Sequence, residues 1–250
     1  MSGHSKWSTI KRKKGALDAK RGKIFSRLAK EITVAAKLGG GDAEMNPRLR
    51  TVLLAAKGQN MPKDNIERAI KKGTGEIEGV SYEEQRYECY GVAGVALIVD
   101  TLTDNKNRTV AEVRHSVNKH GGSMGESGAV TWNFDQKGVI SVEKEGLSDD
   151  DIFEKATEAG ADDVDMDGEL YDVFTDPGEL HNVVSALEGM GIEAKEAKLT
   201  MVPKNQVAVD AKALKSVLNL MEALEELDDV QDVYCNVEIT DDAMAEVMAG

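Results

Sequence analysis

Apolar residues in the first third of the chain recur at the three- to four-residue spacing of an amphipathic helix. At about 100° per residue, one side of a helix over residues 18–38 carries Ile24, Phe25, Leu28, Ile32 and Ala35. The opposite side carries Lys20, Lys23, Arg27, Lys30 and Lys37. Three consecutive glycines at 39–41 end this pattern. The sequence therefore predicts a helix with one core stripe and one basic stripe.

Two shorter helices are predicted next. Asn46 and Pro47 are residue types that favour the N-cap and the first helical position. A third helix is expected from about Lys63 to Lys72, with a stop at Gly73. Residues 20–75 thus form a predicted three-helix unit. The preceding residues 1–16 lack apolar periodicity, and we expect them to form a mobile arm.

From residue 81 onward, β-branched and alternating segments replace the helical spacing. Strands are predicted over 87–90 and 95–103, followed by a helix over 108–120. A glycine-rich connector, GGSMGESG, then leads to a predicted strand over 129–134. These strands and this helix need partners from elsewhere in the chain to bury their apolar faces.

The segment 138–203 has a recognisable order of elements. A strand at 138–143 is followed by a helix that Ser148 is expected to cap. Two short strands lie around a turn near Gly168, and residues Asp176–Glu179 are expected to cap the next helix. A last strand spans 197–202. The order β-α-β-β-α-β is that of a ferredoxin-like unit.

The remaining C-terminal segment predicts one helix, about 210–227, and one strand, 230–239. A helix and a strand bury too little to fold alone, so the simplest arrangement joins them to 81–135. The predicted fold class is α+β with three domains. They are a basic arm plus three-helix domain (1–80), a discontinuous α/β domain (81–135 with 204–250) and an inserted ferredoxin-like domain (136–203).

Charge is distributed unevenly along the chain. The formal net charge is −14, yet residues 1–80 hold 18 Lys and Arg against 8 Asp and Glu, a balance of +10. Residues 81–250 hold 13 against 37, a balance of −24. Such asymmetry suggests a basic segment that meets a polyanion, and a solvated basic face without a partner is the alternative.

Cysteine usage and hydropathy indicate the compartment. The two cysteines, Cys89 and Cys235, form no CxxC pattern, which favours a reducing environment. No run of about 18 apolar residues is present, so we expect no membrane span. The basic N-terminus lacks the apolar stretch of a secretory signal. The expected location is the cytoplasm.

Recognisable catalytic and metal motifs are missing from the sequence. There is no Walker A, GxGxxG or HExxH sequence. Asp163–Gly168 (DVDMDG) fits the start of a calcium loop, but the twelfth position is Phe174 instead of an acid. The predictions are therefore no catalytic residue, no metal site and no cofactor. A small-molecule sensor has only fold analogy in its favour.

The basic positions remain as the candidate site. Clustered Lys and Arg bind phosphates by counterion release, independently of sequence. Trp7 could stack on a base or pack into the core. The predicted nucleic-acid contacts are Lys6, Trp7, Lys11, Arg12, Lys13, Lys14, Lys20, Arg21, Lys23, Arg27 and Lys30.

Three stretches resemble the YebC/PmpR family. They are GHSKWSTIKRKKGALDAKRGKIFSRLAKEI at 3–32, NPRLRTVLLAAKGQNMPKDNIERAIKKGTGE at 46–76, and YECYGVAGVALIVDTLTDNKNRTVAEVRHSVNKHGGSMGESGAVTWNF at 87–134. The resemblance covers essentially the whole chain. YGVAG at 90–94 departs from the family's usual proline-glycine turn, and Cys89 stands in place of its glycine. Neither change touches a basic position.

The resemblance implies three domains, the last inserted within the second, and a non-enzymatic role with nucleic acid. Bacterial members of the family are described as DNA-binding transcriptional regulators, mitochondrial relatives as translational activators. Some bacterial members ease synthesis of proline-rich stretches on the ribosome. The leading hypothesis is a DNA-binding transcriptional regulator that contacts promoter DNA. The alternative is a translation factor that contacts ribosomal RNA, and the sequence does not indicate an oligomeric state.

Overall fold

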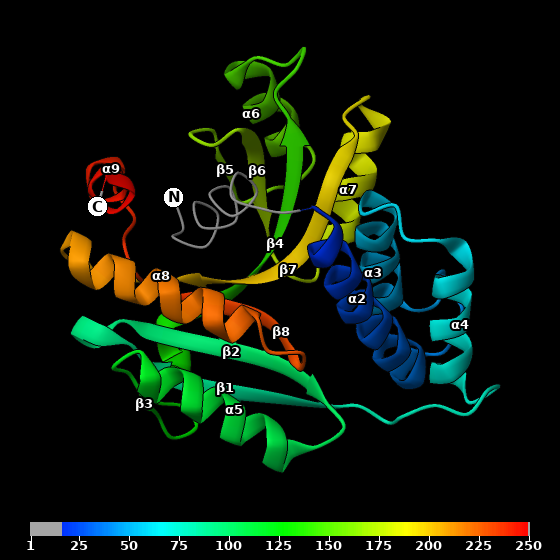
Figure 1. Cartoon of the computed structure of the whole chain (residues 1–250). Coiled ribbons are helices and arrows are strands. Elements are labelled where there is room, and N and C mark those ends of the chain that lie inside the picture. The colour runs from blue at the N-terminus through cyan, green and yellow to red at the C-terminus, as the bar shows by residue number, and fades with distance from the viewer. Residues whose placement is uncertain (1–16, 250) are drawn as a thin grey trace. The chain divides into compact units, whose positions relative to one another are not determined.

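The computed structural model describes residues 17–249, which form two compact units (Figure 1). The first unit contains the described residues up to Val80 together with 136–201. The second contains 81–135 together with 202–249. The α+β class expected from the sequence is confirmed, because the described residues combine helices with two four-stranded sheets.

Three helices make up the N-terminal part of the first unit: α2 (Leu17–Gly39), α3 (Pro47–Gly58) and α4 (Lys63–Thr74). Their shared core includes Ile32, Leu49 and Ala69. Asn46 ties two of the helices together, since its Oδ1 accepts from Leu49 N at 3.1 Å and its Nδ2 donates to Ala35 O at 2.8 Å. The predicted N-cap at Asn46 is confirmed.

The predicted stop at Gly73 is wrong, and packing explains why. Helix α4 continues to Thr74, and the residue with the left-handed C-cap conformation is Gly75, at φ 81°. A Cβ on Gly73 would lie 2.4 Å from Thr33 O and 2.7 Å from Ala36 Cβ. Gly73 therefore serves the close approach of α4 to α2 instead of ending the helix.

The second part of the first unit has the predicted β-α-β-β-α-β order. Its elements are β4 (Phe134–Glu143), α6 (Asp149–Glu158), β5 (Asp163–Asp165), β6 (Leu170–Thr175), α7 (Leu180–Gly189) and β7 (Ala194–Pro203). The strands lie in the order β5-β6-β4-β7, with both β4 and β5 antiparallel to β6. The core between sheet and helices includes Ile140, Ile152 and Leu187. This is a ferredoxin-like sheet.

The two predicted helix caps in this region have different outcomes. Ser148 forms a capping box with Asp151 at the start of α6. In contrast, α7 begins only at Leu180, and its N-cap residue Glu179 makes no side-chain capping bond. The carboxylate of Asp176 instead accepts from Gly178 N at 2.9 Å, so it stabilises the turn before the helix.

The second unit contains β1 (Glu83–Tyr90), β2 (Ala96–Thr103), α5 (Lys106–Lys119), β3 (Ser123–Met124), α8 (Ala211–Glu225), β8 (Val230–Cys235) and α9 (Asp241–Ala249). Its strands lie in the order β3-β1-β2-β8, and each neighbouring pair is antiparallel. This order is the ferredoxin-like one with a permuted chain. Strand β1 comes first in the sequence but takes the place of the third strand.

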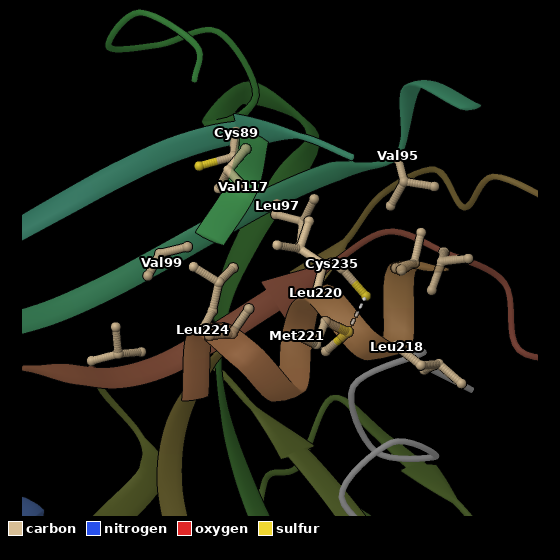
Figure 2. Packing of buried hydrophobic residues seen from close by; sticks show 14 of the residues in the cluster. Cys89, Val95, Leu97, Val99, Val117, Leu218, Leu220, Met221, Leu224 and Cys235 are labelled. Carbon is tan, nitrogen blue, oxygen red and sulfur yellow. Dashed lines mark hydrogen bonds between the residues drawn. The ribbon is translucent and has the colours of Figure 1, made fainter. Parts of the chain in front are cut away.

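Figure 2 shows the core of the second unit, where side chains of α8 meet those of β1, β2 and β8. Leu220, Met221 and Leu224 point from α8 toward the sheet. Cys235 Sγ lies 3.3 Å from Met221 Sδ. The predicted C-terminal helix and strand are confirmed as α8 and β8, and together they supply the apolar partners that β1 and β2 need.

The predicted strand over 129–134 is wrong. The segment forms a short 3-10 helix, η2 (Thr131–Asn133), and β4 begins only at Phe134. The backbone N–H groups of Val130 and Thr131 donate to the Glu88 carboxylate, at 2.7 and 2.9 Å, instead of to a neighbouring strand. The Glu88 carboxylate thus takes the place of the backbone carbonyls that would accept these hydrogen bonds in a β-sheet.

Candidate nucleic-acid interface

The basic stripe predicted on the first helix falls within α2. Lys20, Arg21, Lys23, Arg27 and Lys30 all belong to this helix. Arg21 is exposed, whereas Lys23, Arg27 and Lys30 are half-buried. Lys6, Trp7, Lys11, Arg12, Lys13 and Lys14 lie outside the described residues.

Helical spacing places the α2 cations together. Lys23, Arg27 and Lys30 follow one another at intervals of three or four residues, so they share one face. Ile32 and Ala35, both fully buried, anchor the helix in the core. The guanidinium of Arg27 is itself partly enclosed, since its Nε is buried.

Helix α3 also carries cations, and two of them, Arg48 and Arg50, have structural partners. The guanidinium of Arg48 donates to Glu31 Oε1, with Nη2 at 2.9 Å. Arg50 donates to the backbone carbonyls of Ala43 and Glu44, at 3.1 and 2.7 Å. Both residues hold the α2–α3 connection in place, so they are poor candidates for phosphate contacts.

Helix α4 presents a second basic face, which the predicted contacts did not include. Arg68, Lys71 and Lys72 are exposed, and within residues 17–249 none of them forms an ion pair. The opposite side of α4 packs into the core through Ala69 and Ile70. The signal was present in the sequence as IERAIKK, but Lys71 and Lys72 also fit the general preference for cations in a last helical turn.

The two basic helices pack directly against each other. Thr33 Oγ1 lies 3.2 Å from Ala69 O on α4 and 2.8 Å from Ala29 O on its own helix. Together with the close approach at Gly73, this hydrogen bond fixes the spacing of the helices. The backbones of the two helices that carry these cations are therefore held at a fixed spacing.

The rest of the chain is acidic. The inserted segment 136–201 holds 5 Lys and Arg against 18 Asp and Glu, and the second unit holds 8 against 19. Some of these acids are used internally. Asp229, 3% exposed, accepts from Thr103 Oγ1, Thr109 Oγ1 and Arg108 Nη2 at 3.1, 2.8 and 2.6 Å. The TDNKNRT segment thus has a structural role, because it encloses a buried carboxylate.

Three other kinds of chemistry or location can be compared with this surface over the described residues: a metal cluster, a reactive thiol and a membrane span. Among residues 17–249, no group of three or more His, Cys, Asp or Glu is placed to hold a metal ion. Burial raises the pKa of both Cys89 and Cys235 to about 12, so neither thiol ionises near neutral pH. Over the same residues, no helix has the length and apolar character that a membrane span requires.

Comparison with known proteins accounts for nearly the whole chain. Residues 5–76 match the family model described as the TACO1/YebC protein N-terminal domain, and residues 82–237 match that of the TACO1/YebC second and third domain. The chain belongs to the TACO1/YebC family. The resemblance that the three sequence stretches carry is confirmed.

Similar TACO1/YebC proteins carry a common name. A probable transcriptional regulatory protein of Trichlorobacter lovleyi is 57% identical over 248 residues, which cover 99% of this chain and all of that protein. One of Geobacter sp. strain M21 is 55% identical with the same coverage. The crystal structure of a conserved hypothetical protein of Aquifex aeolicus is 48% identical, with a TM-score of 0.85, and covers 90% of this chain and 93% of its own.

Proposed function

We propose that this protein is a non-enzymatic, DNA-binding transcriptional regulator of the cytoplasm. The observation that carries the proposal is the confinement of excess positive charge to residues 1–80, where the cations of α4 are exposed and α2 shares a core with that helix. The arm before α2 adds Lys6, Lys11, Arg12, Lys13 and Lys14. Cations of this kind contact phosphates and position a protein on a duplex.

Two further observations support the proposal. Proteins more than half identical over nearly the full length are named probable transcriptional regulatory proteins. The acidic remainder repels phosphates, so it keeps contact with DNA confined to the basic end. We further propose that residues 1–80 form the DNA-binding domain. The two α/β domains, one made of 81–135 with 204–250 and the other of 136–203, would then make no contact with the DNA backbone.

Fluorescence anisotropy with a labelled promoter duplex tests this function. Contact with about six phosphates implies a loss of affinity of roughly a thousandfold between about 50 and 200 mM salt. Reversal of the arm charges (Lys11→Glu, Arg12→Glu, Lys13→Glu and Lys14→Glu) should weaken binding strongly at low salt. The proposal fails if this variant binds the duplex as tightly as the wild-type protein.

A ribosome-associated translation factor that aids elongation through proline-rich stretches is the second candidate. The same basic residues are compatible with this function, because phosphate contacts alone do not distinguish DNA from RNA. Sedimentation with ribosomes at low salt discriminates between the two. The second proposal would replace the first if the wild-type protein co-sedimented with ribosomes, the arm variant did not, and the wild type left no footprint on promoter DNA.

A further inference from the structure

An exposed pair of aromatic side chains lies in the second unit, which contains neither α2 nor α4. Trp132 is 67% exposed and Tyr90 is 37% exposed. Trp132 Nε1 donates to the backbone oxygen of Ala129 at 2.9 Å, and Tyr90 Oη donates to the same oxygen, also at 2.9 Å. The two aromatic side chains are therefore neighbours that share one anchor.

Hydrogen bonds to Glu88 hold the segment that contains Ala129 in place. Glu88, 6% exposed, accepts from the backbone N–H groups of Gly128, Val130 and Thr131 at 2.6, 2.7 and 2.9 Å. Gly125 N donates to Glu88 O at 2.7 Å. Trp132 and Tyr90 are thus fixed before any ligand arrives, and a partner would lose little free energy in ordering them.

The shared hydrogen bonds to Ala129 O also determine which ligands the two aromatic side chains can bind. The indole N–H and the phenol O–H both donate to Ala129, so neither is available to a phosphate or carboxylate. What faces solvent is aromatic surface, whose negative quadrupole attracts cations. The surrounding unit adds to this preference, since it holds 8 Lys and Arg against 19 Asp and Glu.

We propose that Trp132 and Tyr90 form a binding site for a cationic side chain, an arginine or lysine in a basic peptide segment of a partner protein. The acidic unit steers such a segment to the site, and the indole face receives the cation. Nucleic acid is disfavoured here by the same acidic charge that attracts the peptide. The site would let the acidic unit bind a protein while the basic end holds a polyanion, and it does not depend on which polyanion that is.

A variant with one tryptophan tests the proposal. The chain has two, Trp7 and Trp132, so Trp7→Phe leaves Trp132 as the sole indole fluorophore. The probe is a ten-residue peptide of alternating arginine and glycine. We expect a saturable change in Trp132 emission with this peptide and none with the peptide in which citrulline, neutral and of the same shape, replaces arginine.

Affinity is measured separately with a labelled arginine peptide in the full-length protein. Trp132→Ala should weaken binding by about two- to fivefold, as expected for a cation over an exposed indole. Phe153→Ala is the matched control, because Phe153 is an aromatic residue of α6 that is 52% exposed in the other unit. It should leave the affinity unchanged. Trp132→Phe, which keeps an aromatic face, should fall between the two.

Three results would overturn the proposal. The first is equal peptide affinity for the wild type and a folded Trp132→Ala variant. The second is an emission change of equal size with the citrulline peptide. The third is stronger saturable quenching of Trp132 by oligouridylate than by the arginine peptide, which would assign the site to stacking on unpaired bases.

Discussion

The carboxylate of Glu88 is enclosed in the second unit, yet it remains the charged acceptor of three backbone N–H groups. Burial acts to raise the pKa of Glu88, but the hydrogen bonds from Val130, Gly128 and Thr131 outweigh it and hold that pKa below its ordinary value. One side chain therefore replaces the strand partner that the segment 128–131 lacks.

Substitution of Glu88 by Gln should lower the free energy of unfolding by about 2 kcal/mol near neutral pH, because charge-assisted bonds to buried N–H groups are removed. The folded-state pKa lies below the unfolded value of about 4.3, so the carboxylate's contribution is complete above that value. It is lost as the pH falls through the folded-state pKa. Urea unfolding of both proteins between pH 7 and pH 3 measures the difference.

The matched control is Glu126→Gln, because Glu126 is an exposed carboxylate of the same segment. It should change stability by less than about 0.5 kcal/mol. A Glu88→Gln protein as stable as this control at pH 7, or a difference that grows toward acid pH, would contradict the role assigned to Glu88.

At the scale of elements, the pairing of α2 with α4 depends on a residue without a side chain. Gly73 lies inside α4, where alanine would ordinarily be the better helix former by about 1 kcal/mol. Its position against Thr33 O and Ala36 Cβ reverses that preference. Gly73→Ala should therefore destabilise the protein by about 1–3 kcal/mol through forced separation of the helices.

Gly22 provides the comparison, because it lies in α2 and a Cβ there would meet nothing within 4 Å. Gly22→Ala should be neutral or stabilising by up to about 1 kcal/mol. Thermal unfolding of the two variants measures the contrast. If Gly73→Ala were no less stable than Gly22→Ala, the close approach of α4 to α2 would not exist in solution.

Most elements could be predicted from the sequence, and the failures have physical causes. Asn46 and Ser148 predict the starts of their helices, because a capping interaction joins residues only a few positions apart. The role of Gly73 depends on Thr33, forty residues earlier, and that of Glu88 on residues 128–131. Long-range interactions of this kind leave no local pattern. The helix α9 was not predicted either, since its segment is short and mostly small or acidic residues.

The candidate site was predicted in part for the same reason. The α2 cations follow a helical period and could be found by counting. The tertiary structure decides which of the other cations are exposed. Arg48 pairs with Glu31 and Arg50 donates to backbone carbonyls. Among the exposed cations are Arg68, Lys71 and Lys72. The amino-acid composition does not distinguish the paired cations from the exposed ones.

At the scale of the whole molecule, segregation of charge is the organising feature. Residues 1–80 carry +10 and residues 81–250 carry −24, so the first segment attracts a polyanion and the remaining residues repel it. The proposed function predicts that phosphate contacts come from the cations of residues 1–80, including those of α4, and not from the cations scattered over residues 81–250.

The salt dependence of nucleic-acid affinity tests this claim most directly. The comparison uses the wild type, an α4 variant (Arg68→Gln, Lys71→Gln and Lys72→Gln) and a control on α8 (Lys212→Gln and Lys215→Gln), all at exposed positions. For duplex DNA, the slope of log affinity against log salt should become shallower by about 0.9 for each phosphate that the α4 variant no longer neutralises. The α8 control should keep the wild-type slope. An unchanged slope in the α4 variant, or an equal change in the control, would contradict the claim.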